Sequence, residues 1–138
     1  MSLPLLLDTC AAIFIAEGET LSKPARLALD RAFDDATPVW ISPISAWEIG
    51  LLVSRGRMRI QIAPQVWFRR LLDDLNLLLA DMPPDVLISS SQLPETALRD
   101  PADRIIVVTA REYGYRIVTR DNPILQYAAS GHVQAVGC

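Results

Sequence analysis

Short apolar runs alternate with longer amphipathic stretches along this chain. Runs such as Leu5-Leu6-Leu7 and Leu77-Leu78-Leu79 contain no polar position, which is typical of strands buried on both faces of a parallel sheet. The stretches between them place apolar residues at helical spacing. The pattern predicts strands at residues 3–7, 39–41, 77–80, 116–119 and 133–136, and helices at 9–16, 23–35, 44–54, 64–74, 84–92, 102–113 and 123–130.

This alternation predicts an α/β fold. Strand and helix units in succession favour a three-layer α/β/α architecture with a central, mostly parallel sheet of four or five strands. Neither a repeat nor a linker divides the chain, so we expect one domain over residues 1–138. The functional crevice of such a sheet lies at the carboxyl ends of its strands.

Composition narrows the class of protein. With 51% hydrophobic residues and a net charge of −3, the chain is too apolar to be disordered. No apolar run reaches the roughly 20 residues of a membrane span, and no basic residue precedes Lys23 as a signal peptide requires. The two cysteines, Cys10 and Cys138, suit a reducing compartment. We therefore expect a soluble, cytoplasmic protein.

The charges are unevenly distributed. An acidic chain does not bind nucleic acid by overall charge, yet residues 49–72 contain no acid. Five arginines fall in that stretch: Arg55, Arg57, Arg59, Arg69 and Arg70. Arginine suits bidentate contacts with phosphate. The group is either a solvated helix face, a subunit interface or a local surface that holds phosphates.

Four acids occupy equivalent places in the predicted units. Each ends a strand or lies in the first turns of the helix that follows it: Asp8, Glu48, Asp103 and Asp121. Taken singly, each has a structural explanation as a helix cap or first-turn acid. Ser45-x-x-Glu48 matches a capping box, and Asp100 before Pro101 is expected to be an N-cap. Together they can converge, because strand ends and helix starts of a parallel sheet share one edge.

Converging carboxylates favour a metal. Two carboxylates about 5 Å apart repel by about 3 kcal/mol at an effective dielectric of 20, so they stay ionised only if helix dipoles and a cation offset the repulsion. Oxygen ligands suit Mg²⁺ or Mn²⁺ rather than zinc. The single histidine, His132, and the lack of a nucleophile–base pair argue against triad chemistry. The leading chemistry is metal-activated water attacking a phosphodiester.

Four short motifs resemble one family over Leu5 to about Val136. They are Leu-Leu-Asp-Thr at 6–9, Ser-x-x-Glu at 45–48, Asp-Pro-x-Asp-Arg at 100–104 and Thr-x-Asp at 119–121. In this order and spacing they resemble the PIN-domain ribonucleases, and among them the VapC-like toxins of bacterial toxin–antitoxin pairs.

The resemblance implies an endoribonuclease that uses Mg²⁺ or Mn²⁺. It assigns the catalytic metal site to Asp8, Glu48, Asp103 and Asp121, and a supporting place to Thr9 and Thr119. It also implies a homodimer, an RNA substrate and neutralisation by a cognate antitoxin. From the sequence alone, Asp100 is a further supporting candidate, and the candidates for RNA contact are Arg104, Arg55, Arg57 and Arg59.

Other interpretations remain open. The protein can be an inactive scaffold of the same fold that only binds RNA or protein, which affinity for Mn²⁺ would distinguish. A phosphotransfer enzyme with Asp8 as nucleophile is disfavoured, because position 10 is Cys10 rather than a second acid. Arg104 can instead form a salt bridge with Asp100 or Asp103. We expect Trp40 and Trp47 in the core rather than stacked on bases, and Cys10 as a small buried side chain.

Overall fold

The central element is a five-stranded sheet, seen in a computed structural model that describes residues 2–94 and 98–138. All pairings are parallel, in the order β3-β2-β1-β4-β5. The strands are β1 (Leu5–Leu7), β2 (Val39–Ile41), β3 (Leu77–Leu79), β4 (Arg116–Thr119) and β5 (Gln134–Gly137). This confirms the predicted parallel α/β sheet with five strands.

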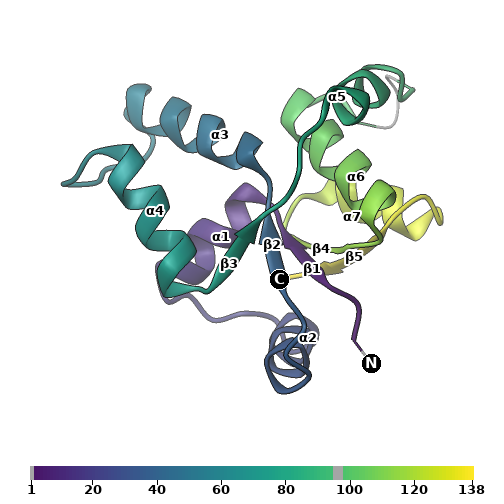
Figure 1. Ribbon diagram of the computed structural model, residues 1–138, viewed down its shortest axis with the longest axis horizontal. Helices are drawn as coiled ribbons and strands as arrows, with labels where there is room; N and C mark the ends of the chain where they lie inside the picture. The colour runs from purple at the N-terminus through teal and green to yellow at the C-terminus, as the bar shows by residue number, and fades with distance from the viewer. Residues whose placement is uncertain (1, 95–97) are drawn as a thin grey trace.

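Seven helices connect the strands in the described residues (Figure 1). Proline occupies the first turn of six of them, where its missing N–H costs no hydrogen bond. None of these helices is long and apolar enough to cross a membrane. They are α1 (Thr9–Ala16), α2 (Lys23–Asp34), α3 (Pro43–Ser54), α4 (Pro64–Asp74), α5 (Pro84–Ser91), α6 (Pro101–Tyr113) and α7 (Asn122–Ala129).

The sheet separates two apolar clusters. On one face the side chains of Leu5 and Leu7 pack with α1, α2 and α4. On the other face Leu6 and Ile117 pack with α6 and α7. Alternate residues of β1 thus serve opposite layers, and all three are fully buried. The predicted three-layer arrangement is confirmed, and it explains why the strand sequence carries no polar position.

The order of the strands places a topological switch beside β1. The chain runs from β1 outward through β2 and β3, then returns to β4 on the other side of β1. Helices after β1 and β4 therefore leave to opposite faces, which opens a crevice at the carboxyl ends of these strands. Figure 1 shows α3 with α4 and α5 with α6 diverging on either side of this end of the sheet.

Two single-residue predictions are wrong. Trp47 is 57% exposed, because Ser45 and Ile49 are the residues of α3 that turn inward. Cys10 is also exposed rather than buried, since Thr9, Ala11 and Ala12 form the inner side of α1. Trp40 meets the expectation: it packs against the core and stacks on Tyr115 with ring centroids 5.5 Å apart.

Candidate metal centre

Asp8 links the central strand to the first helix. It directly follows β1, and its N–H continues the β1–β4 ladder with a bond to the Val118 carbonyl (3.1 Å). Its Oδ1 accepts from the Ala11 N–H (2.7 Å), so the side chain is also the N-cap of α1. Only 3% of Asp8 is exposed. A carboxylate is thereby held rigidly at the switch point.

The hydroxyl of Thr119 orients the second oxygen of Asp8. Thr119 is the last residue of β4, is fully buried, and donates to Asp8 Oδ2. The same hydroxyl oxygen accepts from the Asp121 N–H (2.9 Å). Thr119 therefore connects two of the four predicted acids through one atom, which gives a geometric basis for its predicted supporting place.

Glu48 is held by α1 rather than by the start of its own helix. The N-cap of α3 is Ser42, so the predicted capping box at Ser45 and Glu48 is wrong. Instead, the Thr9 hydroxyl contacts both Glu48 Oε1 and Ser45 Oγ, the latter at 2.8 Å. Because a hydroxyl has one proton and a carboxylate only accepts, Thr9 donates to Glu48 and accepts from Ser45. Glu48 is thus turned toward the end of β1.

Asp100, Asp103 and Asp121 lie at the starts of two further helices. Asp100 caps α6 by accepting from the Asp103 N–H (3.1 Å), as predicted. Asp121 caps α7 by accepting from the Ile124 N–H (3.1 Å). Asp103 lies in the first turn of α6. The positive end of each helix dipole favours a carboxylate at these places.

The carboxylates act on one another electrostatically. Burial raises the pKa of Asp103 to about 8, with further contributions from Asp100, Asp121, Glu48 and Asp8. Burial is also the main cause of the raised pKa of Glu48, which the Thr9 bond opposes and three neighbouring acids reinforce. The pKa of Asp8 is raised by burial and by Asp121, against the bonds from Thr119 and Ala11. Within residues 2–94 and 98–138, the groups that act to lower these pKa values are hydrogen-bond donors, namely Thr119 and Ala11 on Asp8 and Thr9 on Glu48.

Cys10 lies beside the same acids. Its pKa is raised to about 11, first by burial and then by the charges of Asp8, Glu48, Asp103 and Asp121. All four predicted acids therefore act on one thiol, although they come from four separate chain segments. A thiol with this pKa is protonated at neutral pH and is a poor nucleophile. We conclude that Cys10 adjoins the acid cluster without adding chemistry to it.

The acid cluster, meaning Asp8, Glu48, Asp103 and Asp121, fits a hard divalent cation by its donor chemistry. Its ligands are all carboxylate oxygens, and the pKa values of Glu48 and Asp103 are raised by burial and by neighbouring acids. Within residues 2–94 and 98–138, no group of three or more His, Cys, Asp or Glu side chains could hold an ion by itself. Mg²⁺ matches such an open site, because it keeps several waters and takes one or two carboxylates together with substrate phosphates.

Arg104 serves the scaffold instead of a ligand surface. Its guanidinium donates to the carbonyls of Ser90 (Nε, 2.8 Å) and Leu98 (2.7 Å), and to those of Leu93 and Pro94. These acceptors belong to the end of α5 and the segment that leads to α6. The prediction that Arg104 binds RNA is therefore corrected, and so is the alternative of a salt bridge with Asp100 or Asp103: the side chain fixes α5 against α6.

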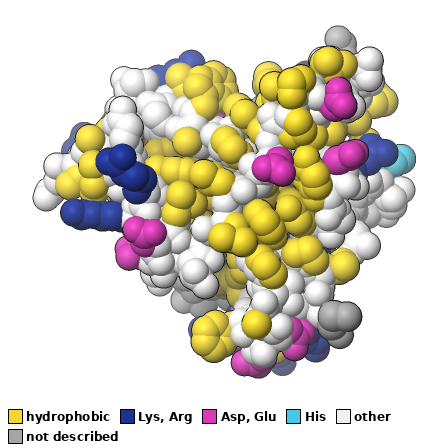
Figure 2. Space-filling view, viewed as in Figure 1, with side chains coloured by type: hydrophobic (Ala, Val, Ile, Leu, Met, Phe, Trp, Pro, Cys, Tyr) yellow, Lys and Arg dark blue, Asp and Glu magenta, His cyan; other side chains and the backbone are white. Residues whose placement is uncertain are grey.

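The other predicted RNA-contact residues lie apart from the acids. Arg55 ends α3, and Arg57 and Arg59 follow it in the turn toward α4; all three are exposed. Figure 2 shows basic side chains gathered over this part of the molecule. The seven residues from Glu48 to Arg55 span about 10 Å at 1.5 Å per helical residue. An extended ligand is needed to reach both groups.

Two residues of the site were missed by reasoning from the sequence. Ser45, expected as a cap, instead contacts Thr9 beside Glu48. Trp47, expected in the core, stands exposed next to Glu48 on α3. The position of the helix start decides both, because Ser42-Pro43 is itself an N-cap followed by a first-turn proline. That dipeptide is the signal that could have placed them.

Comparison with known proteins gives consistent results. Residues 5–129 match the PIN domain. The chain is 32% identical over 117 residues to the ribonuclease VapC22 of Mycobacterium tuberculosis, covering 84% of this chain and 85% of that protein. Among solved structures, VapBC2 of Rickettsia felis bound to promoter DNA aligns with a TM-score of 0.70 at 14% identity, over 98% of both chains. A toxin–antitoxin complex from Klebsiella pneumoniae aligns with a TM-score of 0.60 at 21% identity, over 96% and 95% of the two chains.

Proposed function

The chain belongs to the PIN-domain family, and we propose that it is a metal-dependent endoribonuclease acting as the toxin of a toxin–antitoxin pair. One observation carries the catalytic part of the proposal. Asp8, Glu48 and Asp103 come from three segments at the switch point, and the pKa of each is raised by burial and by neighbouring acids, with Asp121 acting on all three. Such a cluster is costly to the fold. A divalent cation relieves that cost and can in turn hold an anionic phosphodiester beside the acids.

Each of the four acids has a role in metal binding or proton transfer. Asp8 is the primary metal ligand, since β1 and the cap of α1 hold it most rigidly and Thr119 fixes its rotamer. Asp103 and Asp121 complete the ligand set directly or through water. A bound Mg²⁺ supplies a lowered pKa for water and neutralises charge on the scissile phosphate. Glu48, oriented by Thr9 and with a raised pKa, accepts the proton of the attacking water.

Recognition of RNA extends beyond the acids. The exposed indole of Trp47 adjoins Glu48 and offers a platform for an unpaired base. Flanking phosphates are held by the arginines at the end of α3 and in the turn toward α4, namely Arg55, Arg57 and Arg59. This arrangement favours single-stranded or looped RNA, because a base must leave its duplex neighbours to stack on Trp47.

Both the family of this chain and its exposed apolar surface suggest protein partners. Solved relatives of the same fold are toxin–antitoxin complexes, and we propose a cognate antitoxin protein and a homodimer for this chain. Figure 2 shows apolar side chains spread over one face of the molecule; Leu78 and Leu79 of the edge strand β3 are 45% and 47% exposed. Such a surface suits contact with protein. Two free thiols are compatible with a cytoplasmic location.

The test is 5′-end sequencing of total bacterial RNA after incubation with the purified protein. We expect new 5′ ends that require Mg²⁺, vanish with EDTA, and vanish in Asp8→Asn while Asp30→Asn, an exposed carboxylate on α2, retains them. Profiles that do not differ between wild type and Asp8→Asn would contradict the nuclease and support the alternative of a non-catalytic PIN-fold module that binds RNA or protein.

A further inference from the structure

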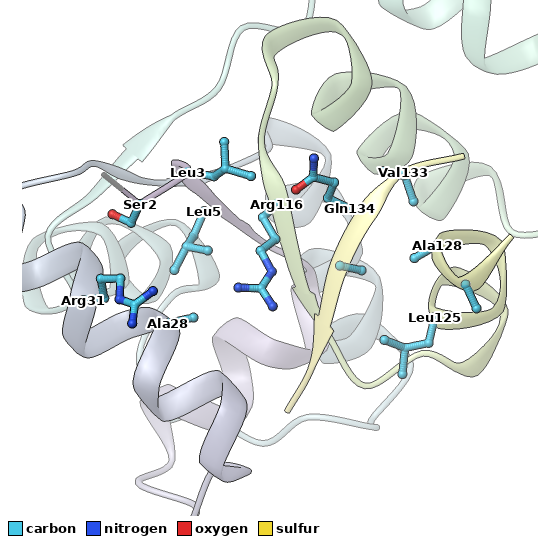
Figure 3. A pocket seen from close by; sticks show the side chains of 12 residues that line it. Ser2, Leu3, Leu5, Ala28, Arg31, Arg116, Leu125, Ala128, Val133 and Gln134 are labelled. Carbon is cyan, nitrogen blue, oxygen red and sulfur yellow. The ribbon is translucent and has the colours of Figure 1, made fainter. Parts of the chain in front are cut away.

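A second cavity lies at the opposite end of the sheet from the acid cluster. Its volume is about 640 Å³, which is within the range of small-molecule sites. Arg116 and Gln134 are the first residues of β4 and β5, so the cavity opens at the amino ends of the strands. Helices α2 and α7 form its sides (Figure 3).

Two arginines share this cavity. Figure 3 shows Arg31 beside α2 and Arg116 projecting from β4 toward α2, with Leu5 and Ala28 between them in this view. Arg116 is only partly exposed. Within residues 2–94 and 98–138, neither guanidinium has a hydrogen-bond or ion-pair partner. Arg31 is exposed and Arg116 is partly buried, so an anion bound in this cavity would be attracted by both charges.

The remaining lining is small and apolar. The helices contribute mainly alanines, and the strands contribute leucine and valine. Flat walls of this kind accept a planar or aliphatic body next to the charged group. The apolar lining consists of Leu3, Leu5, Ala28, Leu125, Ala128, Ala129, Val133 and Ala135.

The free edge of the sheet adds a polar group. β5 is the last strand, and its Cys138 N–H donates inward to the Thr119 carbonyl. Backbone groups of alternate residues point to opposite sides of a strand, so those of Gly137 and Ala135 point outward. The Gly137 carbonyl accepts from the Ser22 hydroxyl (2.6 Å). Ala135 itself lines the cavity.

We propose that this cavity binds a small organic phosphate, that is, a phosphate monoester carried on a planar or apolar body such as a nucleoside monophosphate. The two guanidinium groups match a dianionic phosphate by charge and by bidentate geometry. The alanine-lined walls receive the body of the ligand. The site is separate from the acid cluster and does not depend on metal.

The test is isothermal titration calorimetry in EDTA with adenosine 5′-monophosphate. We expect one saturable site, at least tenfold weaker binding in the double variant Arg31→Gln/Arg116→Gln, and unchanged binding in Arg26→Gln and Asp8→Asn. Adenosine and inorganic phosphate should each bind at least tenfold more weakly than the monophosphate. Arg26 is exposed on the same helix but does not line the cavity.

Several results would overturn the site. No binding at about 1 mM ligand, the weakest range of useful affinity, or equal binding by the double variant excludes it. Inorganic phosphate binding as tightly as the monophosphate would overturn the requirement for an organic body. Amide chemical-shift mapping on the wild-type protein decides the matter if the double variant fails to fold: shifts at Ala28 and Gln134 support the site, and shifts confined to Asp8 and Glu48 contradict it.

Discussion

The two ends of the sheet gather charged side chains of opposite sign, acids at the carboxyl end and two arginines at the amino end. At the carboxyl end, Asp8 and Thr119 are buried and joined by a hydrogen bond, and helix N-termini face the acids. At the amino end, Arg31 and Arg116 line an open cavity among small apolar residues. The fold thus orients the acids and also holds them close enough to repel one another. The arginines are placed by the fold, but no side-chain bond to another described residue orients them.

Comparing the two ends distinguishes side chains that stabilise the protein from side chains that are available to bind a ligand. Arg104 shows the first case, since its guanidinium is fully engaged with backbone carbonyls. Arg116 shows the second case. Asp8 combines both, because one oxygen caps a helix while burial, and to a smaller extent Asp121, disfavours its charge. Removing side chains one at a time should therefore affect stability and function separately.

The largest expected effect is on stability. Arg104→Ala leaves several partly buried carbonyls without a donor, so we expect a loss of about 3 kcal/mol in the free energy of unfolding. Arg116→Ala removes no bond and should change it by less than about 1 kcal/mol. Urea denaturation of both variants measures the contrast. Equal losses of unfolding free energy in the two variants would contradict a structural role for Arg104 that Arg116 lacks.

The next effect concerns orientation at the acid end. Thr119→Val keeps the shape of the side chain but removes the donor to Asp8, so we expect cleavage to fall by at least about tenfold, as a bond to a charged group is worth about 1.5–3 kcal/mol. Thr109→Val is the control, because Thr109 is equally buried and bonds only to the Ile105 carbonyl of its own helix (2.7 Å). Equal rates in the two variants would contradict the positioning role of Thr119.

The smallest effect is a dependence of stability on pH in metal-free protein. The pKa of Asp103 is about 8 in the folded chain against an ordinary value of 3.8, so the folded state binds more protons between these values. Stability conferred by that proton must fall as pH rises from about 4 to about 8. Because Asp103 is only partly buried, solvent screening reduces this effect well below the full pKa difference; melting temperature in EDTA should decline over this range by a few degrees, and less in Asp103→Asn. The same slope in the variant would show that other groups cause it.

Much of the architecture could be predicted from the sequence. The apolar runs mark strands because a parallel sheet is buried on both faces, and the capping residues Asp8, Asp100 and Asp121 mark helix starts. The convergence of the acids could be predicted as well, since it requires only that strand ends share an edge.

Side-chain direction could not be predicted in this way. The charge of Arg104 makes it a candidate for phosphate contact in the sequence, but the fold surrounds its guanidinium with carbonyls, among them those of Ser90 and Leu98. The apolar neighbours of Trp47 in the sequence predict a core position, but α3 is oriented so that the side chain is exposed. The arginine cavity at the amino end joins residues 31 and 116, which no local pattern connects.

The most direct test of the central claim is Mn²⁺ binding, measured by calorimetry at pH 7 in two buffers of different ionisation enthalpy. The wild-type protein should bind the cation and release protons, because a carboxyl with a pKa of about 8 is largely protonated at this pH until the metal displaces its proton. Asp8→Asn should bind at least tenfold more weakly, and Asp30→Asn should not differ from wild type. Equal affinity in wild type and Asp8→Asn, or no binding by either, would contradict a metal centre at the carboxyl end of the sheet.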